Sequence, residues 1–341
     1  MKELALFYPQ GHEAHYEAGH PERPERVNAI QNALDEAGLW EYFPKLEPVD
    51  LPVDVYHNIH SPNYLSYLKK ASENSEHLDA DTYTTPATWD LALKAAGGAA
   101  AVADSVWSGE ARRGLALTRP PGHHATFNQG MGFCLLNNIA LAAEYLIGQK
   151  GAQNIAIVDL DVHHGNGTQD IFWLREDVLF LSVHQSPLYP GTGRIDERGG
   201  GIGEGMTVNI PLPPYSGDQA YRAVTDEVIL PMLQRYGPQI ILVSVGFDTH
   251  WKDPLANQLL SAAGYAEIAG NLAQLADGIC EGRIALFLEG GYDLEAGSAC
   301  LVGCVSAMLN REWTDPIGPS PHPEREAWSS VVQKIRAAWQ I

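Results

Sequence analysis

The stretch that decides the fold reads Asn154-Ile155-Ala156-Ile157-Val158-Asp159-Leu160-Asp161-Val162-His163-His164-Gly165-Asn166-Gly167. Residues 154–158 form a short β-branched run that predicts a buried strand. Alternate residues of a strand share a face, so we expect Asp159, Asp161 and His163 to point the same way. A carboxylate and an imidazole two residues apart can hold one divalent metal ion. Taken alone, such a pair is more often a buried salt bridge or a polar turn.

Four other apolar runs end in polar residues in the same way. They are residues 114–117 before Pro120-Pro121-Gly122-His123-His124, residues 178–181 before Ser182-Val183-His184, residues 240–245 before Gly246-Phe247-Asp248, and residues 284–288 before Glu289-Gly290-Gly291-Tyr292. Strands that alternate with helical stretches predict an α/β fold with a parallel sheet. In such sheets, ligands bind outside the carboxyl ends of the strands. We therefore expect the five strand ends to converge on one crevice.

The composition excludes several classes of protein. The chain has 341 residues, 22 of them basic and 42 acidic, and a net charge of −20. This balance argues against nucleic-acid binding and suits cationic substrates, although solubility alone can explain it. Four cysteines are too few for a disulfide framework, and no apolar run has the length of a signal peptide or a membrane span. The expectation is a cytoplasmic protein without a nucleic-acid or membrane partner, and nothing indicates an oligomer.

Helical periodicity predicts most elements between the strands. A helix is expected from Pro24 to about Gly38, and one helical region over residues 55–75, with His60 near its start. Residues 328–339 carry apolar side chains at helical spacing and predict a helix packed on the domain. Arg26 is either a surface charge or turned inward towards a carboxylate or an anion, and periodicity does not choose between these.

The polar strand ends together offer the parts of a metal site. Asp161, His163 and Asp248 would provide three ligands and leave one position open. Two carboxylates and one imidazole suit zinc, but also iron or another divalent ion. Such an ion would lower the pKa of a water molecule towards neutrality.

Residues around this site can supply acid–base chemistry. His123 and His124 can act as general base and general acid. Asp159 and Asn166 can hydrogen-bond these imidazoles and fix their tautomers. Tyr292 follows a Gly-Gly turn and can donate a hydrogen bond to a developing oxyanion. Together with a metal ion, these groups predict the hydrolysis of an amide.

The motifs, taken in this order, resemble those of the histone deacetylase family. They are Arg119-Pro120-Pro121-Gly122-His123-His124, the stretch 159–169, Tyr189-Pro190-Gly191-Thr192-Gly193, Gly246-Phe247-Asp248 and Glu289-Gly290-Gly291-Tyr292. The resemblance runs from His20-Pro21-Glu22 to about residue 310. It implies the arginase–deacetylase fold, with an eight-stranded parallel sheet in a single domain over residues 1–341. The catalytic core would span about 1–310, and a helical tail about 311–341.

The resemblance also implies an activity and a set of site residues. The activity is zinc-dependent removal of acetyl or other acyl groups from lysine side chains or small acylated amines. The implied roles are zinc ligation by Asp161, His163 and Asp248, catalysis by His123, His124 and Tyr292 with Asp159 and Asn166 as partners of the His pair, and substrate binding by Gly132, Phe133, Tyr189, Leu255 and Arg26. Arg26 would lie in an internal cavity near released acetate. A structural K⁺ or Na⁺ would be held by Asp159, Asp161, His163, Ser182 and the main-chain oxygen of Val183, with a second such site near Phe172.

Two positions locate the chain within the family, among class II-like and bacterial deacetylases and acetylpolyamine amidohydrolases. Asn166 stands where class I members have Asp, which makes the chain similar to class II. Leu255 stands where the polyamine-selective relative has Glu, which weakens a polyamine substrate. Two alternatives remain at this point, a different metal hydrolase such as a two-metal ureohydrolase and a metal-stabilised binding protein. The natural substrate, the acyl length and the choice between zinc and iron also stay open.

Overall fold

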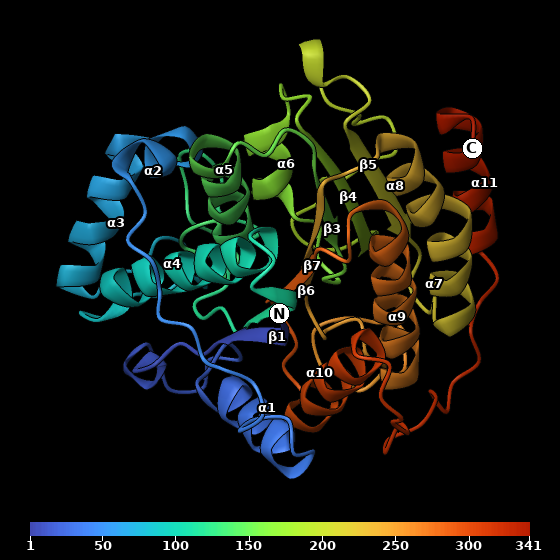
Figure 1. The fold of residues 1–341 in the computed structure, drawn as a ribbon, viewed down its shortest axis with the longest axis horizontal. Coiled ribbons are helices and arrows are strands. Elements are labelled where there is room, and N and C mark those ends of the chain that lie inside the picture. The colour runs from blue at the N-terminus through green and yellow to red at the C-terminus, as the bar shows by residue number, and fades with distance from the viewer.

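The computed structural model describes residues 1–341, and its centre is a twisted sheet of parallel strands (Figure 1). The strands are β1 (Lys2–Phe7), β2 (Ala111–Ala116), β3 (Ile155–Asp159), β4 (Val178–Gln185), β5 (Thr207–Leu212), β6 (Ile240–Val245) and β7 (Ile284–Leu288). Their order across the sheet is β1-β2-β7-β6-β3-β4-β5, and all six pairings are parallel. The predicted α/β fold with a parallel sheet is confirmed.

The sheet has seven strands, so the expectation of eight was wrong. Beside the edge strand β1, the chain makes only an isolated bridge between Leu6 and Lys45. Two hydrogen bonds form there, from Leu6 N to Pro44 O at 3.2 Å and from Leu46 N to Leu6 O at 2.7 Å. Pro44 and Pro48 flank the bridge, and proline cannot donate to a ladder. These prolines explain why no eighth strand extends from this contact.

The register of the central strands aligns the polar residues that the sequence singled out. Asp159 at the end of β3 lies opposite Ser182 of β4 on one side and Ser244 of β6 on the other. β4 continues to Gln185, because its residues 183–185 still pair with β5. Ser182 and His184 therefore lie within this strand, and the prediction that they follow it was wrong.

Helices cover both faces of the sheet. They are α1 (Glu25–Glu36), α2 (Val53–Ile59), α3 (Pro62–Asn74), α4 (Thr88–Trp107), α5 (Asn138–Lys150), α6 (Asn166–Phe172), α7 (Asp218–Val224), α8 (Leu230–Tyr236), α9 (Ala262–Ile279), α10 (Leu294–Met308) and α11 (Trp328–Trp339). A π-helical turn, Thr225–Ile229, joins α7 to α8.

Alternation along each strand builds two separate cores. In β3, Ala156 and Val158 join a core of 52 buried residues with α1 and α7–α11, whereas Ile155 and Ile157 join a core of 32 residues with α2–α6. Figure 1 shows these two helical layers on opposite sides of the sheet. Because both faces are covered, the strands are nearly continuous apolar runs, as the sequence shows.

The helical predictions were close, with one instructive difference. The predicted helical region 55–75 is two helices, α2 and α3, which are separated at His60 and Ser61. Ser61 is the N-cap residue of α3, so the chain leaves the helical conformation between α2 and α3. Its side chain accepts a hydrogen bond from Tyr64 N at 3.2 Å, and Pro62 occupies the first turn. The predicted tail helix is α11, with Val332, Ile335 and Trp339 buried.

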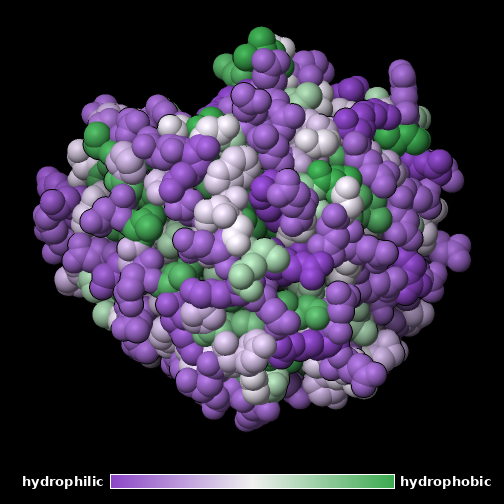
Figure 2. Space-filling model, in the orientation of Figure 1, coloured by the Kyte–Doolittle hydropathy of each residue, from purple (hydrophilic) through white to green (hydrophobic).

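The surface seen in Figure 2 is mainly hydrophilic, with small scattered apolar patches. This agrees with the large excess of acidic residues. None of the helices has both the length and the apolar character needed to cross a membrane.

Candidate active site

Three potential metal ligands gather beyond the carboxyl ends of two neighbouring strands. Asp161 and His163 follow β3, and Asp248 follows β6. One ligand atom from each lies within 4.8 Å of the others. His163 Nδ1 is 3.1 Å from Asp161 Oδ1 and 3.3 Å from Asp248 Oδ2. Because these atoms point to a common centre, the structure brings the three predicted ligands together.

The donor set fits a small divalent cation. Asp248 Oδ2 is buried, and its neighbour His163 Nδ1, at 3.3 Å, makes no well-aligned hydrogen bond to it, which is costly for a carboxylate unless a cation binds there. The other oxygens are fixed by main-chain N–H groups, those of Val162 to Asp248 Oδ1 at 3.0 Å and of Gly290 to Asp161 Oδ2 at 2.9 Å. A Cβ atom at Gly290 would overlap both carboxylates, so this close backbone approach requires glycine.

The pKa values of the two carboxylates in this cluster shift in opposite directions. Burial raises the pKa of Asp248 to about 7, and the adjacent carboxylate of Asp161 adds to this shift. Burial also acts on Asp161, but the imidazoles of His123 and His163 hold the pKa of Asp161 well below its usual value. Two carboxylates that share one buried centre are the arrangement that a divalent cation neutralises.

The two consecutive histidines have different partners. His123 Nδ1 lies 3.0 Å from Asp159 Oδ2, and His124 Nδ1 lies 2.7 Å from Asn166 Oδ1. Burial lowers the pKa of His123, but the charges of Asp159 and Asp161 outweigh burial and raise it to about 10. Burial, followed by the neighbouring His123 and His163, lowers the pKa of His124 well below its usual value. The pair therefore holds one imidazole that favours a proton and one that does not.

A buried glutamate fixes the loop that carries this pair. Glu289 Oε2 accepts hydrogen bonds from the N–H groups of Gly122 at 2.7 Å and His123 at 3.2 Å. Its Oε1 accepts from Ser244 Oγ at 2.9 Å. The sequence placed Glu289 in a motif but assigned it no role. Its position directly after the apolar strand β7 could have marked this charged residue as part of the site.

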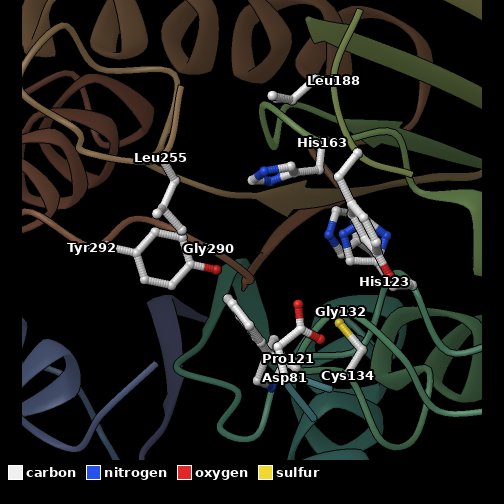
Figure 3. A pocket seen from close by; sticks show the side chains of 13 residues that line it. Asp81, Pro121, His123, Gly132, Cys134, His163, Leu188, Leu255, Gly290 and Tyr292 are labelled. Atoms are coloured by element: carbon white, nitrogen blue, oxygen red, sulfur yellow. The ribbon is translucent and has the colours of Figure 1, made fainter. Parts of the chain in front are cut away.

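Tyr292 faces the histidines across the pocket (Figure 3). Its main-chain N–H donates to Asp253 Oδ2 at 2.7 Å, which fixes the turn after β7. Burial raises the pKa of the Tyr292 hydroxyl well above its usual value. The hydroxyl therefore keeps its proton and can act as a hydrogen-bond donor.

Of these groups, His123, His124, His163 and Tyr292 line one pocket of about 270 Å³. Four of the predicted substrate-binding residues, Gly132, Phe133, Tyr189 and Leu255, are part of its wall. The wall also contains Asp81, Cys134 and Leu188, which the sequence did not single out, and Pro121 and Gly290, which lie in its motifs but had no assigned role. Asp81 lies in the loop between α3 and α4, and no pattern in the sequence marks this loop as part of the site.

Arg26 is not part of this wall but lies behind it. The guanidinium donates to the carbonyl oxygens of Glu289 at 2.6 Å and Gly291 at 2.5 Å, and to Glu22 Oε1 at 3.2 Å. Of the alternatives that the sequence left open, Arg26 is turned inward and paired with a carboxylate. It lines a separate cavity of about 10 Å³, which has room for about one water molecule.

The residues expected around a monovalent cation lie along β3 and β4. Asp159 and Ser182 are paired in register, and Val183 follows within β4. Asp159 Oδ1 accepts a hydrogen bond from Asp161 N at 3.1 Å, and Ser182 Oγ is 2.9 Å from His184 Nδ1. Phe172, near which a second such site is expected, ends α6 and is buried.

The fold and this site define an α/β protein with a candidate metal centre at the carboxyl edge of its sheet. A family described as the histone deacetylase domain matches residues 20–308. A probable deacetylase of Archaeoglobus fulgidus is 43% identical over 292 residues, which cover 85% of this chain and 81% of that protein. A histone deacetylase-like amidohydrolase of Pseudomonas aeruginosa is 36% identical, over 81% of this chain and 73% of that protein.

The solved structures give the same result. The crystal structure of the HDA15 HD domain superposes with a TM-score of 0.90 at 32% identity, and the match covers 99% of this chain and 95% of that one. The chain belongs to the histone deacetylase family. This membership, with relatives named as deacetylases and an amidohydrolase, supports deacetylase activity.

Proposed function

We propose that the protein is a zinc-dependent amidohydrolase that removes acetyl or other acyl groups from lysine side chains or small acylated amines. The observation that carries this proposal is the convergence of Asp161, His163 and Asp248 with the His pair and Tyr292 at one pocket. These ligands fit zinc, and iron is the alternative. When bound, the cation supplies Lewis-acid chemistry, because it polarises a carbonyl and makes a water molecule more acidic.

The chain's own residues would handle the protons. His124, with its lowered pKa and the neutral Asn166 as partner, would accept a proton from water through Nε2. His123, whose Nδ1 lies 3.0 Å from the carboxylate of Asp159, would hold a proton and supply it to the leaving amine. The assignment follows from environments that drive two adjacent pKa values apart.

Tyr292 would stabilise the negative charge that develops on the acyl oxygen. Its hydroxyl keeps its proton, and the turn that carries it is held by Asp253 and by Arg26. A donor aimed at such an oxygen contributes about 3 kcal/mol to transition-state stabilisation. Apolar side chains of Phe133, Leu188, Tyr189 and Leu255 would contact the methylene chain of an acyl-lysine.

We also propose that Asp159, Asp161, His163, Ser182 and the carbonyl of Val183 hold K⁺ or Na⁺. The pairing of Asp159 with Ser182 in register supports this proposal. Two further expectations stay predictions. One is that Arg26 lies near released acetate, and the other is that the protein is cytoplasmic.

The test is hydrolysis of an acetyl-lysine peptide, an acetylated polyamine and a trifluoroacetyl-lysine peptide by zinc-loaded protein. We expect turnover of the acetyl-lysine peptide, and a loss of about 100-fold or more in kcat for Tyr292→Phe, because one oxyanion donor is removed. The control is the zinc content, which should not change in this variant. No turnover of any of the three substrates by the zinc-loaded wild type would refute the proposal. Two bound divalent ions per chain would favour a ureohydrolase instead.

A further inference from the structure

The loop of residues 126–137 forms one wall of the pocket in a conformation that it cannot hold alone. It contributes Gly132, Phe133 and Cys134 to the pocket lining. Gly132 has a φ of 55° and Phe133 a φ of 69°, so two consecutive residues are left-handed. For a bulky residue such as phenylalanine this conformation costs about 1–2 kcal/mol. It persists only where surrounding contacts determine it.

At the strained residue itself, Thr82 Oγ1 accepts a hydrogen bond from Phe133 N at 3.1 Å. The two ends of the loop are held by residues 60–64, which comprise the link after α2 and the first turn of α3. His60 Nδ1 lies 2.9 Å from Thr126 O, and Ser61 N donates to Phe127 O at 2.8 Å. At the other end of the loop, Tyr64 Oη donates to Leu135 O at 2.5 Å, and Asn137 N donates to His60 Nε2 at 2.9 Å. The segment thus holds both ends of the loop, through main-chain atoms of residues 126, 127, 135 and 137.

His60 joins the two ends with a single ring. Since the main-chain N–H of Asn137 donates to Nε2, the ring proton must lie on Nδ1, where it meets the carbonyl of Thr126. The ring is fully buried, and burial lowers its pKa to about 4. A neutral imidazole with this one tautomer satisfies both main-chain groups, and a protonated ring cannot accept from Asn137.

We propose that His60 and Tyr64 are positioning residues for substrate binding, which act through the 126–137 loop. None of residues 60–64 lines the pocket, so neither side chain touches substrate. α2 and α3 lie at one side of the molecule, outside the parallel sheet (Figure 1). Through this segment, an element that contributes nothing to the candidate metal site holds a wall of the pocket. The proposal rests on the proposed function of that pocket.

The loop contains its own reporter. Cys134 is buried, and burial raises the pKa of its thiol well above the usual value. While the loop keeps its native conformation, this thiol should therefore react slowly with iodoacetamide. The other three cysteines, Cys280, Cys300 and Cys304, are also free and buried, and they lie outside the loop. Their alkylation rates, measured by mass spectrometry on the same sample, serve as internal references.

The experiment compares zinc-loaded wild type with His60→Leu, His60→Gln and Tyr64→Phe. We expect alkylation of Cys134 to become about tenfold faster in Tyr64→Phe, because the loss of one buried hydrogen bond favours local opening by about that factor, and faster still in His60→Leu, which loses two such bonds. KM for an acetyl-lysine peptide should rise by a similar factor and kcat should fall less. His60→Gln retains a donor and an acceptor and should stay closer to wild type. Tyr67→Phe is the matched control, since Tyr67 lies one turn further along α3 and is exposed.

Each outcome decides a separate point. If Cys134 reacts no faster in His60→Leu and Tyr64→Phe than in Tyr67→Phe, the proposed hold on the loop is wrong. If Cys134 reacts faster and KM is unchanged, the contacts are structural only and the positioning role is wrong. If His60→Leu does not fold, Tyr64→Phe and His60→Gln still give the answer. Alkylation needs no turnover, so a failure of the deacylase proposal would be recognised separately by an inactive wild type.

Discussion

Two loops enclose the candidate active site, and they are held in different ways. The 126–137 loop is held through its main chain, by residues that lie outside the sheet. The 186–198 loop, which carries Leu188 and Tyr189, is held by side chains that rise from the sheet and from α6. His164 Nδ1 lies 2.8 Å from Thr192 Oγ1, and His184 Nε2 lies 3.0 Å from Gly193 O. Glu197 Oε2 accepts from Gly193 N at 3.0 Å and from Gln169 Nε2 at 2.8 Å.

The difference determines which changes each wall tolerates. Cys134 in the first loop is 1% exposed, whereas Tyr189 in the second loop is 40% exposed. The first wall depends on a few buried contacts, those at its two ends and that of Thr82 with Phe133. The second depends on close packing of Gly193 against the imidazoles of His184, in β4, and His164, which follows the candidate ligand His163 in the chain. The 186–198 loop is therefore positioned by residues close to the candidate metal ligands, and the 126–137 loop by Thr82 and by residues 60–64.

The largest effect is expected for Gly193→Ala in the second loop. Gly193 has a φ of 87°, and a Cβ atom there would lie 2.5 Å from His184 Nε2. Left-handed strain and overpacking together should lower the free energy of unfolding by about 4 kcal/mol. Gly191 has the same φ with no atom within 4 Å of its Cβ position, so Gly191→Ala should cost only about 1 kcal/mol. Urea unfolding of both variants is the measurement, and equal losses would contradict this account of the wall.

A somewhat smaller effect concerns pH and the first loop. His60 has a folded pKa of about 4 against an ordinary value of 6.5, because it is buried. Its contribution to stability is complete above pH 6.5 and is lost as the pH falls towards 4, by about 3 kcal/mol in total. In His60→Gln this part of the pH dependence should disappear. The gap in unfolding free energy between variant and wild type should therefore narrow by about 3 kcal/mol from pH 7 to pH 4.

The control for this measurement is His57→Gln, because His57 lies on α2 with an exposed side chain. It should leave the pH dependence unchanged. A wild type and a His60→Gln variant whose stabilities fall in parallel with pH would show that the His60 ring does not need to be neutral.

The smallest effects are expected for two threonines, one that holds the 126–137 loop and one within the 186–198 loop. Thr82 Oγ1 accepts from Phe133 N at 3.1 Å and is buried, so Thr82→Val should cost about 2 kcal/mol. Thr192 is exposed, so water can replace its hydroxyl beside His164, and Thr192→Val should cost about 0.5 kcal/mol. Thermal unfolding resolves this difference. The reverse order of losses would mean that the second loop depends on its hydrogen bonds more than on its packing.

Much of the site could be predicted from the sequence, because strand ends are marked by an abrupt change from apolar to charged residues. Asp159, Asp161 and Asp248 each follow such a change, and a parallel sheet brings its carboxyl ends to one edge. The convergence of Asp161, His163 and Asp248 follows from these two facts. The family resemblance added Phe133 and Tyr189, which do line the pocket.

The rest depended on contacts between distant segments. Asp81 and Leu188 lie in loops whose paths are set by partners far away in the chain, so no local pattern identifies them. The inward orientation of Arg26 depends on carbonyl groups more than 260 positions later in the sequence, in the turn after β7. The missing eighth strand depends on Pro44 and Pro48, which are visible in the sequence but matter only once their position beside β1 is known.

The strand order has a consequence for synthesis of the chain. β6 and β7 are made last, yet they fill the middle of the sheet, between β2 and β3. When residue 212 has left the ribosome, the nascent chain holds two partial sheets, β1–β2 and β3–β4–β5, whose inner edges have no partner yet. Unpaired edges promote aggregation, and slow non-local pairing prolongs their exposure. The nascent protein should therefore depend most on chaperones between the release of β5 and that of β7.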